Sequence, residues 1–568
     1  MQKAQEISNA AVAKIKHGQI FQGYKLLKEA HKLDPGNTDI RTNLLLVIEK
    51  ITLIFFNKAN YHKACYYTRK AIKLQNSARF YANLGHFMFM LGNKHGAIKS
   101  LEKAIEIDSD YANSYLNLGN VYFSIGGFNQ AALLYQKAIE LDPANGSLLS
   151  PLYDAKAHMC DWRGLKRLSR LLDRKEGHES PFHNLIRVAN EEVNFKVASA
   201  WSSQYESPRL STPKHTNKKI NVGYLSDGFR DFPTGHNLIG VLENHDRSKY
   251  NIYCYSWGKN DKSKVRDRFM RANKFIDINN LDDEEAARKI AGNQIDILVD
   301  LKGFTLNNRF GILSYKPSPV QISYLGFPGT TGAKFIDYFI ADTTVLPESS
   351  QKYYSEKILY LPSCYRPVDT DYPKIKINKS TLREKYNLPK DARIFASFNQ
   401  SYKITSEMFK VWLKILDHSP NNYLWQLESN NFFHKNLAKL TNKIILAKDV
   451  AHEEHLERIK AADLALDTYP VNGHTTTVEA LISGVPVVTL KGKHFASRVS
   501  ESVLKVFNLD FLVAENLEEY KNIAIKYINN PPLVKNPKNF TIKTYTKNLE
   551  KAYNEAYLNE QHSGPKIS

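Results

Sequence analysis

The 568-residue sequence has few cysteines and no long hydrophobic run. Its four cysteines, Cys65, Cys160, Cys254 and Cys364, are far apart and form no Cys-x-x-Cys pair. This spacing excludes a disulfide framework, argues against a structural zinc site and favours a reducing compartment, so we expect a cytoplasmic protein. The longest apolar runs, for example 44–48, are too short to span a bilayer, and no transmembrane segment is expected.

From the first residues and the motifs present, we expect neither a secretory signal nor a nucleic-acid-binding site. Residues 1–6 lead into an amphipathic helix rather than an apolar signal core. The formal charge is +20, but the lysines are spread along the whole chain, so we expect most of them on solvated faces. The excess positive charge would favour an anionic ligand, an acidic protein or a membrane surface, and without a motif we expect no nucleic-acid partner.

Repeats fill the first part of the chain. The segment 81–85 recurs at 115–119, and the segment 104–107 recurs at 138–141, in both cases with a period of 34 residues. This period is typical of tetratricopeptide repeats, in which each helical hairpin buries its apolar face by stacking on the next. We predict an α/α solenoid of four repeats over residues 1–147, with a groove for protein acceptors. The alternative is a rigid spacer or a homodimerisation arm.

The remainder predicts a helical linker and two α/β lobes. The linker, 148–217, loses the repeat and leads into a polar stretch at 207–219. Short apolar runs then alternate with helices in two series, which predicts two Rossmann-like lobes over 218–385 and 386–568. Ligands of such sheets bind beyond the carboxyl ends of the strands, so a cleft between the lobes is the expected site. The predicted strands are 220–225, 250–255, 295–300, 320–324 and 338–341, then 394–398, 423–427, 444–446, 462–466 and one ending at 489.

One stretch of the second lobe, 467–489, combines a strand end, a tight turn and a helix start. The helix begins at His474, Thr475 and Thr476 with free backbone N–H groups and hydroxyls. These groups and the helix dipole favour an anion, and a diphosphate would suit them. Glu479 lies one turn further in, where it would reach a sugar hydroxyl but repel a phosphate. The alternative is an ordinary threonine-capped helix with nothing bound.

Two further groups lie at element ends. Gln400 and Lys403 follow the strand that ends at residue 398, and a lysine there would neutralise the diphosphate that leaves a nucleotide sugar. The alternative is a surface lysine that caps a helix. His452 and His455 begin a helix among carboxylates, but two histidines without a third ligand are weak evidence for a metal. An imidazole that packs on a base or ribose explains His455 equally well.

Together these motifs resemble the O-linked N-acetylglucosamine transferases and the SPINDLY-type fucosyltransferases. The resemblance runs through nearly the whole chain in order, and it implies a GT-B-type, metal-independent, inverting glycosyltransferase without a cofactor. Such an enzyme would move a sugar from a nucleotide sugar onto Ser or Thr of proteins, with UDP-N-acetylglucosamine as the leading donor and GDP-fucose or UDP-glucose still open. The similar segments are 325–330, 398–403, 472–476 and 496–498, with the helical link and the preceding repeats.

The resemblance also implies roles for single residues. Lys403 would stabilise the departing nucleotide, Glu479 would bind the ribose and His455 would pack against the base. Glu479 stands where the family often has Asp. The loop 325–330 would line the sugar pocket from the first lobe. The implied donor site consists of Gln400, Lys403, His455, His474, Thr475, Thr476 and Glu479.

Departures from the family lie on the acceptor side. Phe232 stands where many relatives have a histidine before Pro-Thr, and Gly228 stands where a carboxylate is expected. A general base must come within hydrogen-bond reach of the acceptor hydroxyl. Asp227, Asp231 and His236 are the candidates, and the sequence does not rank them.

Two other functions stay open at this point. The chain would be a repeat-based protein-binding module if its sheets were a degenerate nucleotide-sugar sensor, or it would act on a glycan rather than a protein. The complete donor set favours the protein-modifying enzyme. Residues 372–387 leave no room for the domain inserted between the lobes of the animal enzymes, which indicates a bacterial-type member.

Overall fold

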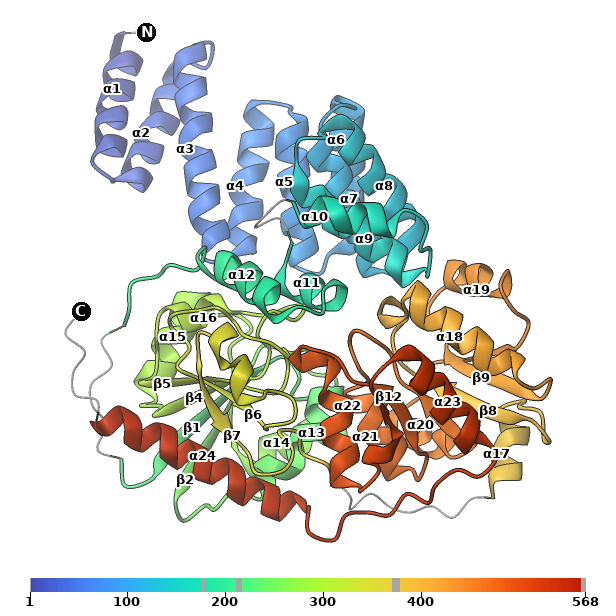
Figure 1. The fold of residues 1–568 in the computed structure, drawn as a ribbon. Helices are drawn as coiled ribbons and strands as arrows, with labels where there is room; N and C mark the ends of the chain where they lie inside the picture. Colours follow the sequence, from blue (N-terminus) through green and yellow to red (C-terminus); the bar gives the residue numbers. More distant parts are fainter. Residues whose placement is uncertain (1, 175–178, 211–216, 370–377, 563–568) are drawn as a thin grey trace. The chain divides into compact units, whose positions relative to one another are not determined.

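The computed structural model describes residues 2–174, 179–210, 217–369 and 378–562. Residues 211–216 of the predicted polar stretch and residues 372–377 of the segment between the lobes lie outside the described residues. The chain divides into two compact units, Met1–Lys156 and Ala157–Ser568 (Figure 1).

Helical hairpins make up the first unit, with α1 paired to α2, α3 to α4, α5 to α6 and α7 to α8. The 34-residue period has a packing cause. A Cβ at Gly85 would lie 2.5 Å from the Leu101 side chain, and one at Gly119 would lie 2.5 Å from the Tyr135 ring, so glycine is required where the paired helices touch. The elements are α1 (Gln2–Lys16), α2 (Ile20–Leu33), α3 (Thr38–Asn57), α4 (Tyr61–Leu74), α5 (Ala78–Met90), α6 (Lys94–Ile107), α7 (Ala112–Ser124), α8 (Phe128–Leu141), η1 (Gly146–Leu148) and α9 (Leu149–His158).

Two parallel sheets form the centre of the second unit. Their strand orders are β3-β2-β1-β4-β5-β6-β7 and β10-β9-β8-β11-β12-β13, so the direction of winding reverses between β1 and β4 and again between β8 and β11. Ligands of doubly wound sheets bind at such reversals. The strands are β1 (Ile220–Ser226), β2 (Tyr250–Ser256), β3 (Lys274–Asp277), β4 (Ile297–Asp300), β5 (Val320–Ser323), β6 (Tyr338–Ala341), β7 (Lys357–Tyr360), β8 (Arg393–Ser397), β9 (Asn422–Leu427), β10 (Ile444–Ala447), β11 (Leu464–Leu466), β12 (Val487–Leu490) and β13 (Val513–Ala514).

Helices connect the strands and cover the sheets (Figure 1). They are α10 (Leu165–Leu172), α11 (Pro181–Arg187) and α12 (Glu191–Ser202) of the linker, α13 (Pro233–Glu243), α14 (Lys264–Ala272), α15 (Asp283–Gly292), α16 (Gly311–Ser314) and η2 (Glu348–Tyr353) of the first lobe, and then α17 (Lys379–Lys385), η3 (Ser401–Lys403), α18 (Ser406–Asp417), α19 (Asn431–Ala438), α20 (His452–Ile459), α21 (Thr475–Ile482), η4 (Phe495–Ser497), α22 (Val499–Val506), η5 (Asp510–Leu512), α23 (Leu517–Ile528) and α24 (Ile542–His562).

The structure confirms the fold class predicted from the sequence, a helical-repeat solenoid followed by two Rossmann-like lobes. Three strands were not predicted: β3, β7 and β13. All three lie at the edges of their sheets. An edge strand is covered less completely than a central one, so its sequence need not be a continuous apolar run. Lysines begin both β3 and β7.

The last helix, α24, packs on the first lobe although it follows the second in the chain. The hydroxyl of Tyr553 lies 3.0 Å from that of Tyr224 on β1, and the hydroxyl of Tyr545 donates to the backbone carbonyl of Tyr365. All four side chains are buried. The division by sequence, which places the chain through residue 568 in the second lobe, therefore differs from the packing of this helix.

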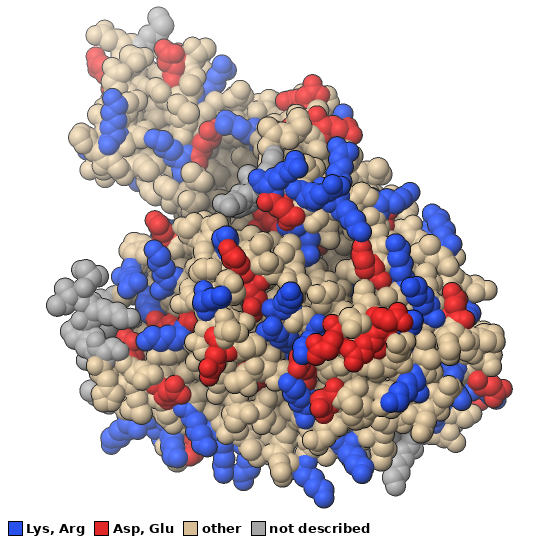
Figure 2. Space-filling view, viewed as in Figure 1, with Lys and Arg blue, Asp and Glu red and all other residues tan. Residues whose placement is uncertain are grey.

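On the face seen in Figure 2, charge is distributed rather than gathered in one block. Figure 2 shows Lys and Arg interleaved with Asp and Glu over the viewed face. No helix of the described residues is both long enough and apolar enough to cross a membrane. The four cysteines are buried, unpaired thiols.

Candidate functional site

The carboxyl ends of β8 and β11 carry the residues predicted to bind a donor. β8 is followed by Asn399 and η3, and β11 is followed by the turn 467–473 and α21. The winding reverses between these two strands, which is where ligands of doubly wound sheets bind. The predicted lysine turn and helix start therefore reach the same edge of one sheet.

Lys403 is held against the turn that precedes α21. Its Nζ donates a hydrogen bond of 2.8 Å to the carbonyl oxygen of Asn472. Burial lowers the pKa of Lys403 to about 8; the Asp467 carboxylate opposes this shift and the Arg366 guanidinium adds to it. Within the described part of the chain, Lys403 forms no ion pair with a carboxylate. It is a cation that lacks a direct counter-ion.

The helical linker is hydrogen-bonded to the turn that carries Lys403. The indole Nε1 of Trp162 donates to the carbonyl oxygen of Ile404 at 3.0 Å, and the hydroxyl of Ser401 donates to the carbonyl oxygen of His158 at 2.8 Å. These two contacts fix both ends of η3. The linker therefore positions the lysine through contacts with the residues on either side of it.

Asp467, just after β11, organises the turn before α21. One oxygen of its carboxylate accepts hydrogen bonds from the backbone N–H groups of Thr468 at 2.8 Å and Gly473 at 2.5 Å. The other oxygen accepts from the hydroxyl of Thr489 at 2.6 Å. A turn folded around one buried carboxylate presents the Asn472 carbonyl to the lysine.

The start of α21 offers backbone N–H donors to an anion. Its own side chains carry no positive charge. The first backbone N–H groups of a helix have no acceptor within the helix. His474 Nε2 donates to the carbonyl oxygen of Ala496 at 3.3 Å. Burial lowers the pKa of His474 well below its usual value, and the nearby Lys403 and Arg366 lower it further, so the imidazole is neutral.

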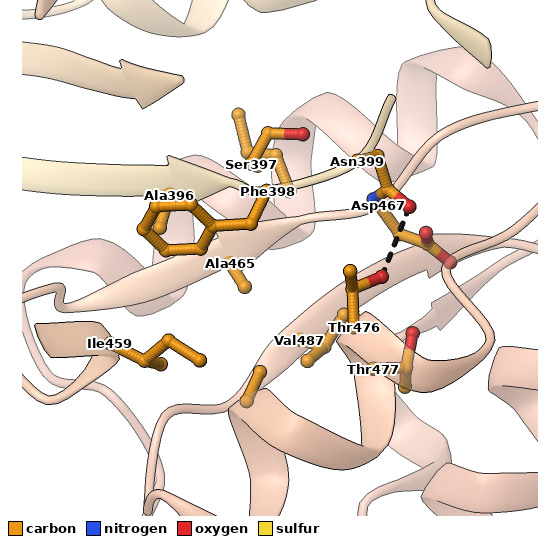
Figure 3. A pocket seen from close by; sticks show the side chains of 12 residues that line it. Ala396, Ser397, Phe398, Asn399, Ile459, Ala465, Asp467, Thr476, Thr477 and Val487 are labelled. Atoms are coloured by element: carbon orange, nitrogen blue, oxygen red, sulfur yellow. Dashed lines mark hydrogen bonds between the residues drawn. The ribbon is translucent and has the colours of Figure 1, made fainter. Parts of the chain in front are cut away.

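A cavity of about 20 Å³ lies between the ends of β8 and β11 and the first turn of α21 (Figure 3). Beside it the hydroxyl of Thr476 donates to Asn399 Oδ1 at 3.0 Å, while the hydroxyl of Thr477 bonds inward to the carbonyl of Gly473. This volume holds about one water, so a nucleotide does not fit there. The cavity is lined by Ala396, Ser397, Phe398, Asn399, Ile459, Ala465, Leu466, Asp467, Thr476, Thr477, Ala480 and Val487.

Glu479, one turn into α21, lies between two histidines of α20. Its carboxylate oxygens are 3.3 Å from His452 Nδ1 and 3.5 Å from His455 Nε2. Arg458 Nε donates to His455 Nδ1 at 3.0 Å, so this imidazole carries its proton on Nε2, the nitrogen that faces the carboxylate. Burial and the neighbouring His236 lower the pKa of His452 to about 4, so its ring is neutral at pH 7.

The first lobe contributes the ring of His236, on α13. It stacks on His452, with centroids 3.8 Å apart and planes 19° apart. Its Nε2 donates to Asp231 Oδ1 at 2.6 Å. Phe232 is 37% exposed, and the guanidinium of Arg230 lies 4.6 Å from its ring centroid.

Asp227 has a different environment from the other two candidate bases. It follows β1, and its carboxylate forms a buried ion pair of 2.9 Å with Lys302, which follows β4. This pair occupies the winding reversal of the first sheet. The structure thus brings Asp231 and His236 into contact with each other and pairs Asp227 elsewhere.

Several residues at the site were not singled out by the sequence. Asn237 Nδ2 and Arg366 Nη2 both donate to the hydroxyl oxygen of Thr475, at 3.2 Å and 3.1 Å. Neither belongs to a motif, and both come from the first lobe. Gln400, which was predicted to point into the cleft, is exposed, and its carbonyl oxygen accepts from the backbone N–H of Lys403 at 3.1 Å.

The spacing of His452 and His455 raised the question of a metal site. Both imidazoles lie against the carboxylate of Glu479. Among the residues that the structure describes, no group of three or more His, Cys, Asp or Glu side chains could hold a metal ion.

Known families and structures resemble both units. The family model described as "Glycosyl transferase family 41" matches residues 193–372 and 368–550. Two repeat models, "TPR repeat" and "Tetratricopeptide repeat", match 89–126 and 112–145. A solved structure of an O-GlcNAc transferase mutant from Thermobaculum terrenum aligns with a TM-score of 0.63 at 23% identity, over 92% of this chain and 98% of that one, and supports the same fold.

Several curated proteins are similar to more than half of the chain. The probable UDP-N-acetylglucosamine–peptide N-acetylglucosaminyltransferase SEC of Arabidopsis thaliana is 34% identical over 359 residues, 59% of this chain and 37% of that protein. The corresponding protein named SPINDLY from the same plant is 30% identical over 336 residues, 55% of this chain and 35% of its own. The UDP-N-acetylglucosamine–peptide N-acetylglucosaminyltransferase of Caenorhabditis elegans is 25% identical over 508 residues, 65% of this chain and 44% of its own.

The chain spans less than half the length of these curated relatives. The family model nevertheless covers both Rossmann-like lobes and more than half of the chain. The chain therefore belongs to glycosyl transferase family 41.

Proposed function

We propose that this chain is a glycosyltransferase that moves N-acetylglucosamine from UDP-N-acetylglucosamine onto Ser or Thr hydroxyls of proteins. The observation that carries this proposal is the approach of Lys403, a cation without an ion-pair partner in the described chain, to the turn that begins α21. A cation and a helix N-terminus together favour a diphosphate. The names of the relatives from plant and nematode, which specify this donor and a peptide acceptor, support the choice.

In the proposed complex, the donor lies along the first turn of α21. Lys403, Gln400, His474, Thr475 and Thr476 bind the diphosphate. Glu479 accepts hydrogen bonds from the ribose, and His455 packs against the base. The hydrogen bond to one ring nitrogen of His455 and the approach of Glu479 to the other support a fixed stacking surface. His452, which lies against Glu479, completes the proposed donor site.

The proposed reaction is a single displacement that inverts the anomeric carbon. The acceptor oxygen forms a bond to that carbon while its bond to the diphosphate breaks, and the electron pair leaves on a phosphate oxygen. The charge of Lys403 and the dipole of α21 stabilise this developing charge. Because these groups supply the positive potential, we propose that the reaction needs no metal ion.

A base must take the proton of the acceptor hydroxyl. The hydrogen bond of Asp231 to His236 Nε2 supports this pair, because it leaves the Nδ1 lone pair able to accept a proton. The ion pair with Lys302 argues against Asp227, whose charge is already matched within the first lobe. We propose that the repeats bind the protein acceptor, since a solenoid offers an extended concave surface.

A panel of donors and acceptors tests the function. The protein is incubated with UDP-N-acetylglucosamine, UDP-glucose or GDP-fucose, with peptide or glycan acceptors, and with or without a chelator. We expect transfer to peptide from the first donor, unchanged by the chelator, with the β-anomer as product from an α-linked donor. Transfer to glycan alone would contradict the protein acceptor. The absence of transfer, hydrolysis and thermal shift with every donor would contradict the enzyme.

A further inference from the structure

Arg366 reaches the donor site from the first lobe. It lies after β7, in the segment that leads towards the second lobe, and its side chain is 3% exposed. Its Nη2 donates a hydrogen bond of 3.1 Å to the hydroxyl oxygen of Thr475, the first residue of α21. A guanidinium of one lobe thus touches the anion-binding helix end of the other.

The contact fixes the direction in which Thr475 donates. Its hydroxyl oxygen also accepts from Asn237 Nδ2 at 3.2 Å. A hydroxyl has two lone pairs and one proton, so two donors leave the proton pointing away from both. Arg366 and Asn237 therefore turn the Thr475 O–H away from the first lobe's donors and leave it able to donate to an anion.

The charge of Arg366 is not balanced by a direct partner. Its buried Nε has no hydrogen-bond partner among the described residues, and no carboxylate of those residues forms an ion pair with it. It lies close enough to Lys403 and His474 to lower the pKa of each. Two buried cations that lack an ion-pair partner near one helix start are costly unless an anion joins them.

We propose that Arg366 is a second diphosphate-binding cation and that it makes the site selective for nucleoside diphosphates over monophosphates. The proposal rests on the proposed function, because it concerns the donor of that reaction. Lys403 offers a compact charge, whereas the planar fork of an arginine can bind two phosphate oxygens at once. A monophosphate can contact one of these two cations, whereas a diphosphate can contact both.

Calorimetric titration with nucleotides tests this selectivity without turnover. The probes are UDP, UMP, GDP and GMP, titrated into the full chain. Arg366→Gln and Arg366→Lys are compared with Arg288→Gln, which removes a largely exposed arginine of α15. We expect the wild type to prefer one diphosphate over its monophosphate by at least about tenfold, the effect of one charge-assisted hydrogen bond. Arg366→Gln should remove most of that preference, Arg366→Lys should remove part of it, and Arg288→Gln should keep it.

The outcomes separate this proposal from the function on which it rests. A preference retained in Arg366→Gln, while wild type binds a diphosphate tightly, would overturn the role of Arg366 and leave the transferase intact. Wild type that binds no nucleoside diphosphate would overturn both. If Arg366→Gln loses its cooperative thermal transition, Arg366→Lys decides: a full preference there would overturn the need for the guanidinium, and a reduced one supports it.

Discussion

His236 of the first lobe and His452 of the second stack face to face, and their ring contact bridges the two lobes beside Glu479. Asp231 accepts a hydrogen bond from His236 Nε2, and Glu479 lies against the ring of His452. A carboxylate, two imidazoles and a second carboxylate thus form a row from lobe to lobe. The row depends on a neutral His452, because burial and the facing ring of His236 oppose a positive charge there.

The stability of the second unit should fall in mild acid partly because of His452. Burial first, then His236 and His455, lower its pKa from 6.5 to about 4, against the raising effects of Glu479 and Asp231. The unfolded chain therefore takes up this proton at a higher pH than the folded one, so stability is lost as pH falls from about 6.5 towards 4. The contribution is at most about 2 kcal/mol between pH 7 and pH 5.

Thermal unfolding of wild type and His452→Gln between pH 7 and pH 5 measures this contribution. The melting temperature of wild type should fall more steeply, because the variant has no proton to take up at this position. His418→Gln, which removes an exposed histidine at the end of α18, should keep the wild-type slope. Equal slopes for wild type and His452→Gln would show that the stacked ring titrates normally.

Replacement of Lys403 should abolish most turnover and leave the fold intact. Lys403→Met keeps the length of the side chain but removes the charge beside α21, and the loss of one such stabilising group lowers kcat by about 10²–10³-fold. Lys410→Met, the same change on the exposed face of α18, is the matched control. Rates are measured with the active donor and compared at matched circular dichroism spectra. A near wild-type rate in Lys403→Met would remove this lysine from the mechanism.

The dependence of kcat/KM on pH should reflect the protonation of Lys403. Its pKa is lowered to about 8, chiefly by burial, so in the free enzyme the ammonium loses its proton as pH rises through that value. kcat/KM should therefore decline above about pH 8, whereas a bound diphosphate favours the charged form and moves the decline in kcat to higher pH. Lys403→Arg stays charged and should lose the decline in whatever activity it retains. If kcat/KM of Lys403→Arg declines over the same alkaline range, the decline belongs to another group.

The sequence predicted well those features whose contacts all lie within one short segment of the chain, namely the repeats and the turn before α21. The repeat period follows from helix pairs that need glycine at Gly85 and Gly119, and that requirement is local. The turn around Asp467 and the helix start at His474 also lie within a few residues of each other. Turn-forming and helix-capping residues predict such local structure directly, because their side chains set the conformation of the backbone next to them.

The features that sequence missed depend on long-range contacts. Arg366 and Asn237 meet Thr475 across 109 and 238 residues of chain. Neither has a local signal, because an arginine in a loop and an asparagine in a helix are ordinary residues until the lobes fold. The same holds for His452, which was weighed as a metal ligand and whose ring partner comes from the first lobe.

Trp162 should act on catalysis through Lys403 without touching a substrate. Its indole donates to the carbonyl of Ile404 and so fixes the turn that carries the lysine. Trp162→Phe removes this one donor, which is worth about 1 kcal/mol, and should lower kcat about fivefold with little change in KM. Trp257→Phe removes a similar indole bond, to Asn307 in the first lobe, and should leave kcat unchanged. Equal effects of the two variants would contradict a positioning role for Trp162.

Glu479 should determine whether the site recognises a ribose. Its carboxylate is buried and held by His452 and His455, so it is oriented before a nucleotide arrives. A carboxylate accepts strong hydrogen bonds from sugar hydroxyls, and Glu479→Gln should weaken UDP binding about tenfold, the effect of one such bond. The 2′-deoxy and 3′-deoxy forms of UDP identify the hydroxyl concerned, because the variant should bind one of them as tightly as wild type does. Glu454→Gln is the control, because Glu454 of α20 is partly exposed and pairs with Lys385 and Tyr386 instead of the two histidines. If the variant weakens UDP and both deoxy forms by the same factor, Glu479 supports the histidines and does not contact the ribose.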